Sequence, residues 1–458
     1  MSEITNLFEY QNKEKFDEDY LQFEDFLNDI WSKREKNSFY YDNQDKKEEI
    51  QQFISFFHKS KELKSKNFVG FIHFNKKTIN LLPKIFYDNQ AEKTINVKAI
   101  QQHILWYLSY CRKIRFPHFQ SSLRCQKNDF FETIIYMFAR YTLNLLSSSI
   151  YQQYEDIENE LSNIKGRINI PSYISNNLSK ARWHKVSCIY DSFILDNKFN
   201  RILKYVSQML VSVTKEDDNK KMLNDILFVL DDVGNERFTA NQCESIVFNP
   251  MLKDFEIVRD YCTLFLATSI SIAYKNELQL FAFLLPMEYI FEDFVYGFID
   301  KEFKDLRIEV SPQSTSNHLD EEKKFNLKPD LLIKIDDKRI ILDTKYKLLL
   351  KDNNISQSDL YQIICYAIRF ECQKVFLLYP CSVQKTSSDS DYELNINDEL
   401  AGKKIKIKIC FLPIINKDLL TRDKNFENCS IREIFETQTN MLKGKLSDLL
   451  KDVSYSMK

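Results

Sequence analysis

Residues 329–345 read PDLLIKIDDKRIILDTK, and no other stretch constrains the fold as tightly. Two apolar segments flank a short polar turn, which predicts a hairpin whose first strand follows a Pro-Asp pair and whose second strand ends in Asp-Thr-Lys. Side chains two residues apart in a strand point to the same face, so Asp343 and Lys345 project together while Thr344 points away. Asp330, on the preceding strand, is placed to meet them across the hairpin.

Two carboxylates and an ammonium at one strand end suit phosphodiester hydrolysis. Mg²⁺ prefers hard oxygen ligands and keeps several waters, so two strand-borne carboxylates together with phosphate oxygens fit it. Lys345 can orient the attacking water and counter the negative charge that builds up at phosphorus. An isolated Asp-x-Lys arises by chance in lysine-rich chains, and ordinary edge-strand charges are the alternative. The complete order of motif elements is that of a PD-(D/E)xK metal-dependent nuclease.

Two predicted helices carry further candidates for the same site. In MEYIFEDFVYGFI the apolar residues form a buried stripe, and Glu288 and Glu292 share one face, four residues apart. Glu292 lies in the middle of the stripe and is the preferred further metal ligand, with a solvated helix face as the alternative. In SDLYQIICYAIRF, Gln362 and Tyr366 lie one helical turn apart, where they could support the site or contact the DNA backbone. Their alternative is a surface glutamine and a core tyrosine.

The composition limits what else the chain can be. A chain of 458 residues with 44% apolar and 28% charged residues predicts a globular protein of two or three domains. No apolar run approaches the roughly 18 residues of a membrane span, and the N-terminus is acidic, so a cytoplasmic protein is expected. Ten cysteines without a C-x-x-C pair, and six dispersed histidines, favour free thiols over a zinc or histidine-based metal site.

Glycine and charge usage say where nucleotides and nucleic acids can bind. The chain has six isolated glycines and no phosphate-cradling loop, so it is not expected to bind a nucleotide, and any nucleotide-driven motor must be another chain. The net charge is −2, but residues 1–60 carry a balance of −6 and residues 321–351 a balance of +3. Phosphate-attracting charge is therefore concentrated around the proposed site. The alternative is that these lysines are merely solvated.

Hydrophobic periodicity divides the chain into three regions. We predict an α+β region over residues 1–125, a mainly helical middle over 126–274, and a C-terminal α/β domain over 275–458. The last is expected to be restriction-endonuclease-like, with a mixed central sheet. Local patterns predict amphipathic helices within residues 1–65, two strands in 68–86, a helix over 129–160, an extended segment over 165–174, a loop over 215–222, a helix over 284–303, and a polar excursion over 382–402.

In these motifs the chain resembles the McrC family, the nuclease subunits of 5-methylcytosine-type, GTP-dependent restriction systems. VGFIHFNKKTINLLPKIF resembles the N-terminal element of that family, and KGRINI and DSFILDNKFNRILKYV resemble its middle signatures. LLPMEYIFEDFV, KPDLLI, ILDTKYK and SDLYQIICYA resemble its nuclease segments and occur in the same order. The acidic N-terminal extension and the long middle depart from compact members of the family.

The resemblance implies an endonuclease that cleaves double-stranded, methylated DNA with Mg²⁺, or with Mn²⁺ as the alternative ion. A separate AAA+ GTPase of the McrB type would activate it, and it would stimulate the GTP hydrolysis of that motor. Residues 1–125 would then be the partner-interaction region, and residues 275–458 the part that cuts. The site residues are Asp330, Asp343 and Glu292 as metal ligands, Lys345 as the catalytic lysine, and Gln362 and Tyr366 in support.

Two other functions fit the same sequence. One is a catalytically silent DNA-binding adaptor that activates the GTPase, although retention of Asp330, Asp343 and Lys345 argues against it. The other is a stand-alone repair nuclease of the RecB-like type that needs no motor. A neighbouring gene for an AAA+ GTPase would favour restriction over repair.

Overall fold

The contacts in a computed structural model divide the chain into two compact units. Unit 1 combines residues 1–131 with residues 267–458, and unit 2 consists of residues 132–266. The structure describes residues 3–16, 20–32, 53–74, 77–88, 96–112, 130–271, 280–304, 308–312, 318–319, 322, 324–335, 338–349, 355–384, 391–398, 403–421 and 430–454. The division into three domains stays a prediction. In the structure, most of the predicted first and third regions belong to the same compact unit.

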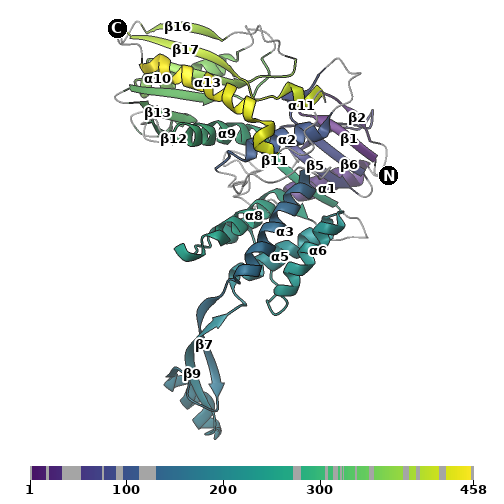
Figure 1. Cartoon of the computed structure of the whole chain (residues 1–458), viewed down its shortest axis with the longest axis vertical. Coiled ribbons are helices and arrows are strands. Elements are labelled where there is room, and N and C mark those ends of the chain that lie inside the picture. The colour runs from purple at the N-terminus through teal and green to yellow at the C-terminus, as the bar shows by residue number, and fades with distance from the viewer. Residues whose placement is uncertain are drawn as a thin grey trace. The chain divides into compact units, whose positions relative to one another are not determined.

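Unit 1 begins with a five-stranded sheet in the order β1-β6-β5-β11-β10 (Figure 1). The strands are β1 (Glu3–Phe8), β6 (Lys77–Leu82), β5 (Phe68–Phe74), β11 (Leu280–Pro286) and β10 (Ser269–Ser271). β1 runs parallel to β6, and the other pairs are antiparallel. The two strands predicted within residues 68–86 are confirmed as β5 and β6.

A smaller sheet and one helix accompany this sheet. They are β2 (Glu14–Lys15), β4 (Glu62–Ser65), β3 (Ile54–Phe57) and α1 (Tyr20–Ser32). The apolar face of α1 buries Phe23, Leu27 and Trp31 in one core with Phe74 and Leu284 of the larger sheet. The expectation of helices within residues 1–65 is therefore wrong for the segments that form β1, β2, β3 and β4, and its part over residues 33–52 lies outside the described residues. The partner of β1 is β6, about 74 residues away, and local periodicity carries no information about such a pairing.

The pairing of β5 with β11 is a close contact between the two halves of unit 1. Gly70 has φ +136°, and a Cβ at this position would lie 2.0 Å from the carbonyl oxygen of Phe283. Only glycine allows this backbone conformation together with this approach. β11 then continues without a break into α9 (Met287–Glu302), so Leu284 to Pro286 belong to a strand, and the predicted helix begins three residues later than expected.

The second large sheet of unit 1 has six strands in the order β12-β13-β14-β15-β17-β16. They are β12 (Ile308–Pro312), β13 (Leu331–Ile335), β14 (Lys338–Thr344), β15 (Lys374–Pro380), β17 (Lys403–Leu412) and β16 (Tyr392–Asp398). β14, β15 and β17 are parallel, and the remaining pairs are antiparallel. The predicted α+β fold with a mixed C-terminal sheet is confirmed. β16 lies within the segment predicted to be a polar excursion, which is a correction.

One face of this sheet is covered by α10 (Gln357–Arg369), which connects β14 to β15. Ile363, Tyr366 and Phe370 of the helix share a core with Leu377 and Ile407 of the strands. The apolar stripe of α10 therefore fixes which way its polar residues face. Gln362 lies next to the buried Ile363 and one turn before the buried Tyr366, so it is held above the end of β14.

Helix α2 (Val97–Leu108), from the N-terminal half of unit 1, packs on the segments that follow β17. Tyr107 donates a hydrogen bond of 2.9 Å to the carbonyl of Ile414, and Nε2 of His103 accepts one of 2.8 Å from the backbone of Asn416. Burial lowers the pKa of His103 to about 4, so the ring is neutral and can accept this bond. Trp106 stacks on Phe435, with 4.8 Å between ring centroids. The remaining elements are η1 (Lys84–Phe86), α11 (Lys417–Thr421), α12 (Ile431–Ile434) and α13 (Glu436–Ser454).

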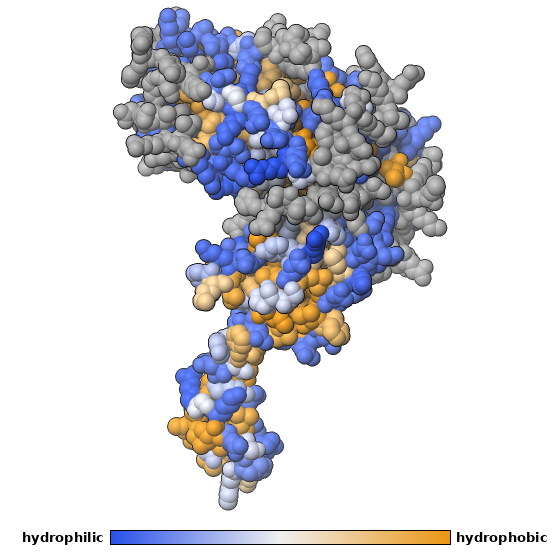
Figure 2. All heavy atoms as spheres, viewed as in Figure 1, coloured by the Kyte–Doolittle hydropathy of each residue, from blue (hydrophilic) through white to orange (hydrophobic). Residues whose placement is uncertain are grey.

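Unit 2 consists of helices and a three-stranded antiparallel sheet in the order β7-β9-β8. Its elements are α3 (Phe130–Ser148), β7 (Gln153–Leu161), β8 (Arg167–Ile168), α4 (Ile170–Ser172), η2 (Tyr173–Asn177), η3 (Leu178–Lys180), β9 (Val186–Ile194), α5 (Lys198–Val213), α6 (Asp217–Val229), α7 (Ala240–Glu244), η4 (Pro250–Leu252) and α8 (Asp254–Thr268). Figure 2 shows hydrophobic residues at the surface of unit 2. Two aromatic side chains, Tyr154 in β7 and Trp183 before β9, are each 73% exposed.

Three local predictions in unit 2 need correction. The helix predicted over 129–160 ends at Ser148, and β7 takes its last residues. The segment 165–174 is extended only in β8, after which the chain forms helical turns. The polar segment 215–222 begins α6, because Glu132 accepts hydrogen bonds from Thr214, Lys215 and Asn219 and thereby fixes the start of that helix.

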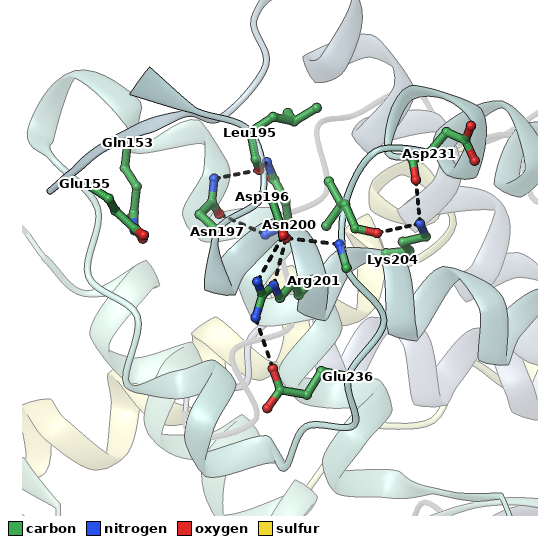
Figure 3. Close-up of polar contacts among 12 residues, drawn as sticks. Gln153, Glu155, Leu195, Asp196, Asn197, Asn200, Arg201, Lys204, Asp231 and Glu236 are labelled. Carbon is green, nitrogen blue, oxygen red and sulfur yellow. Dashed lines mark hydrogen bonds and ion pairs between the residues drawn. The ribbon is translucent and has the colours of Figure 1, made fainter. Parts of the chain in front are cut away.

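The segment DSFILDNKFNRILKYV ties the base of this sheet to α5 (Figure 3). Asn200 donates hydrogen bonds of 2.8 Å to the carbonyls of Tyr151 and Leu195, which lie just outside the paired strands β7 and β9. Arg201 forms a bidentate ion pair with Asp196, at 2.7 and 2.9 Å. Lys204 caps two carbonyls of the α6–α7 connection. This middle signature therefore has a structural role within unit 2.

Within the described ranges, no helix is long and apolar enough to cross a membrane.

We expect Gly70→Ala to destabilise unit 1, because the new Cβ meets the carbonyl of Phe283 and the backbone cannot keep its positive φ without strain. Strain of this kind costs about 1–3 kcal/mol. The matched control is Gly444→Ala, since Gly444 lies inside α13 with no atom within 4 Å of the added Cβ. Alanine there should stabilise the helix by about 0.5–1 kcal/mol. Urea unfolding of both variants measures the difference, and equal midpoints would contradict the role of Gly70.

Candidate active site

Asp330 and Asp343 lie side by side at one end of the β13–β14 hairpin. Leu331 pairs with Leu342 in the antiparallel hairpin. Asp330 precedes Leu331 and Asp343 follows Leu342, so the two aspartates face each other across the strands. Oδ2 of Asp330 accepts hydrogen bonds of 2.7 Å from both the backbone and the hydroxyl of Thr344. The strand end thus fixes the Asp330 carboxylate beside Asp343, and the hydroxyl of Thr344, expected to point away, takes part in holding it.

Lys345 points to the same face as Asp343 and is held there by a chain of polar contacts. Its Nζ lies 2.7 Å from Oδ2 of Asp343 and donates a hydrogen bond of 3.1 Å to Oε1 of Gln362. Gln362 donates a bond of 2.8 Å to the hydroxyl of Tyr366, which donates in turn to the carbonyl of Lys328, at 3.1 Å. The predicted Gln-x-x-x-Tyr pair therefore reaches the lysine. The sequence alone had left open that Gln362 is a surface residue and Tyr366 a core residue.

The electrostatics of this cluster favour a cation. Burial, the charge of Asp343 and the charge of Glu292 together raise the pKa of Asp330 to about 7, against the hydrogen bonds from Thr344. Burial also raises the pKa of Asp343, against the ammonium of Lys345. Burial acts to lower the pKa of Lys345, but the neighbouring carboxylates outweigh it and the pKa is raised. An additional positive charge would relieve the repulsion between the carboxylates.

The carboxylates suit a hard divalent ion that keeps water in its coordination shell. Oδ1 of Asp343 is buried and has no hydrogen-bond partner among the described residues, so it is available as a ligand. In the described part of the chain, however, no three His, Cys, Asp or Glu side chains already surround a common point. Two protein oxygens with added waters are therefore the arrangement that fits.

Glu292 and Glu288 on α9 face different neighbours. The charge of Glu292 raises the pKa of both Asp330 and Asp343, so Glu292 is close enough to act on the site. Glu288 is exposed, and its charge acts instead on Glu9 and Lys84. This difference supports Glu292 as the glutamate of the site, and its role as a metal ligand remains a prediction.

One ion pair beside the site was missed in the sequence. Lys347 contacts both carboxylate oxygens of Asp359, at 2.9 and 2.7 Å. The charge of Asp359 raises the pKa of Asp343, so this pair belongs to the same electrostatic neighbourhood. The signal was present in the sequence, because Lys347 continues the two-residue spacing of Asp343 and Lys345 and Asp359 lies in the first turn of α10.

The fold and the site define an α+β protein with two carboxylates and a lysine at the end of two inner strands of a mixed sheet. The family model described as "McrBC 5-methylcytosine restriction system component" matches residues 63–380 of the chain. No curated protein matches the sequence. The chain therefore belongs to the McrBC 5-methylcytosine restriction system component family, and the predicted resemblance is confirmed.

Two solved structures are similar to this chain. One is the refined half-complex from a tetradecameric assembly of Thermococcus gammatolerans McrB AAA+ hexamers with bound McrC, with a TM-score of 0.65 and 16% identity over 97% of this chain and 100% of that chain. The other is the cryo-EM structure of the Thermococcus gammatolerans McrBC complex, with a TM-score of 0.47 and 16% identity over 66% and 88% of the two chains. At this identity the first supports the fold alone.

We expect Asp330→Asn to remove a pH dependence of stability in metal-free buffer. The pKa of Asp330 in the folded chain is about 7, above its ordinary 3.8, so the folded state binds the additional proton between these values. Stability contributed by this proton is present at low pH and is lost as the pH rises, by at most about 1.4 kcal/mol for each pH unit. Thermal unfolding from pH 5 to pH 8 should show a smaller decline for the asparagine variant. Identical slopes would contradict the burial of this charge.

Proposed function

We propose that the chain is the DNA-cleaving subunit of a modification-dependent restriction system and hydrolyses phosphodiesters with a divalent metal. The observation that carries the proposal is the buried Asp343 beside the partly buried Asp330, with Lys345 in contact with Asp343, at the end of two paired strands. Family membership supports a restriction system, and the chemistry of the three side chains supports cleavage rather than binding alone.

The roles of the side chains follow from their contacts. Asp330 and Asp343 would hold Mg²⁺ or Mn²⁺, which when bound lowers the pKa of water and neutralises charge on the phosphate. Lys345 keeps its positive charge because of the surrounding carboxylates, so it can counter charge developing on the phosphate oxygens. Gln362 fixes the direction of the lysine side chain, and Tyr366 fixes Gln362.

We also propose that the chain works with a separate AAA+ GTPase and stimulates its GTP hydrolysis. The similar solved structure contains McrB AAA+ hexamers with bound McrC, which supports a motor of that type as partner. The absence of a phosphate-cradling glycine loop in the sequence agrees with nucleotide hydrolysis in another chain. The proposed DNA substrate is double-stranded and methylated, in keeping with the description of the family.

The test is GTP-dependent cleavage of methylated and unmethylated DNA by the full chain, purified together with an AAA+ GTPase of the McrB type. We expect Asp343→Ala and Lys345→Ala each to lower the cleavage rate at least about 100-fold, the size of effect seen when a transition-state stabiliser is removed. Stimulation of GTP hydrolysis should be retained, because the two substitutions change only the proposed cleavage site at the end of β14. The readouts are DNA nicking on gels and phosphate release.

The control is Lys443→Ala, which removes another lysine of unit 1 from an ion pair, 3.2 Å from Glu302. This variant should cleave at the parental rate. If the parental protein stimulates the GTPase but never cuts, the chain is a silent adaptor, and the proposed nuclease function is wrong. Cleavage without any motor or GTP would instead identify a stand-alone nuclease.

A further inference from the structure

A buried cluster connects the N-terminal sheet to the strand that carries the proposed catalytic lysine. The Glu9 cluster consists of Glu9, Lys84 and Tyr346, which are 0%, 9% and 4% exposed. Glu9 follows β1, and its backbone donates a hydrogen bond of 2.9 Å to the carbonyl of Leu82 at the end of β6. Oε2 of Glu9 accepts a bond of 3.0 Å from the backbone of Lys84 and one of 2.9 Å from the hydroxyl of Tyr346.

Tyr346 occupies the centre of a tight turn at the end of β14. The backbone of Lys347 donates a hydrogen bond of 2.8 Å to the carbonyl of Lys345, which closes a three-residue turn around Tyr346. Lys345 reaches Asp343 from one side of this turn, and Lys347 reaches Asp359 from the other. A hydrogen bond that fixes the tyrosine therefore fixes the turn from which both lysines project.

The ring of Tyr346 is held on its faces as well as at its hydroxyl. Nζ of Lys84 lies 4.3 Å from the centre of the ring, within the range of a cation–π contact. The ring of Phe291, from α9, lies at a centroid distance of 6.0 Å. The next residue along α9 is Glu292, so the same aromatic side chain also contacts the helix that carries the proposed third carboxylate.

Stability alone gives no reason for a carboxylate at position 9. Oε1 of Glu9 is buried and has no hydrogen-bond partner among the described residues. Burial raises the pKa of Glu9 to about 7, against the charge of Lys84. An apolar side chain of similar volume would avoid this desolvation penalty. What the carboxylate provides is a single oxygen on which two donors, 262 positions apart in the chain, converge.

We propose that Glu9 is a positioning residue for the catalytic strand, acting through the hydroxyl of Tyr346 to hold Lys345 against Asp343. The N-terminal region thus completes the nuclease site in addition to any role in binding a motor. The inference rests on the proposed function, and it adds to it a residue that touches neither substrate nor metal.

The test compares variants of the full chain with its motor. Tyr346→Phe removes one hydroxyl, Glu9→Leu removes the acceptor, and Glu9→Gln keeps an acceptor oxygen. We expect Tyr346→Phe and Glu9→Leu each to lower kcat for DNA cleavage about tenfold, the equivalent of one hydrogen bond, with KM for DNA unchanged. The double variant should lose no more than Glu9→Leu alone, because both substitutions break the same bond. Glu9→Gln should retain most of the activity.

The matched control is Tyr20→Phe, which removes a hydroxyl bonded to the carbonyl of Glu62 elsewhere in unit 1. It should cleave at the parental rate. Parental kcat in folded Tyr346→Phe, or losses that multiply in the double variant, would overturn the inference. A parallel fall in GTPase stimulation would also overturn it, since that marks a general structural defect.

Hydrogen exchange separates failure of this inference from failure of the proposed function. The amides of Lys345 and Lys347 are bonded to Leu378 and Lys345, and these bonds define the turn. Tyr346→Phe and Glu9→Leu should speed exchange in a peptide covering residues 343–349, and Tyr20→Phe should not. This measurement needs no cleavage. Unchanged exchange would refute the positioning role even in an active nuclease, whereas faster exchange in a protein that never cuts would refute only the proposed nuclease function.

Discussion

The approach of β11 to Gly70 is the constraint on which the rest of unit 1 depends. Without a side chain at Gly70, the backbone of Phe283 enters the N-terminal sheet, although the two segments are more than 200 residues apart. β11 then runs directly into α9, which carries Glu292. This close backbone contact therefore helps to set where the helix of the site begins relative to the N-terminal strands, and a second one, between Gly297 of α9 and the carbonyl of Tyr110, holds the helix further along. Position 70 needs both a positive φ and space for the carbonyl of Phe283, and a residue with a Cβ would meet neither need.

The second constraint is electrostatic. The buried Asp343 and the partly buried Asp330 lie beside each other, and Glu292 adds a third negative charge nearby. Lys345 compensates only part of this charge, so the pKa values of both aspartates remain raised. The residues of the site therefore leave part of the repulsion between the carboxylates uncompensated. A bound cation, alone or carried by a phosphate, would remove this repulsion. The pattern is the opposite of a structural ion pair such as Asp196 with Arg201, in which the pKa of the carboxyl is lowered.

The parts of the site that the sequence predicts are those set by local geometry. The spacing of Asp343 and Lys345 decides their common face, and the apolar stripe of α10 decides where Gln362 points. Pairings between distant segments are invisible to such patterns. β1 was taken for part of a helix, because its partner is β6, and β16 was taken for a polar loop, because its partner is the lysine-rich β17. Glu9 could not be assigned, since the hydroxyl it holds belongs to a residue 337 positions later.

These contacts imply that the part of the chain with the proposed nuclease site is not separable at the start of α9. Three consecutive residues at the end of β14 are each fixed by a different element: Thr344 by Asp330, Lys345 by Gln362 of α10, and Tyr346 by Glu9 after β1. Removing the N-terminal strands would leave Asp330 and Asp343 in place but would remove the hydrogen bond from Tyr346 to Glu9. It would also leave β11 without its sheet. The N-terminal sheet is therefore part of the site's support, and unit 2 is inserted between two halves that must fold together.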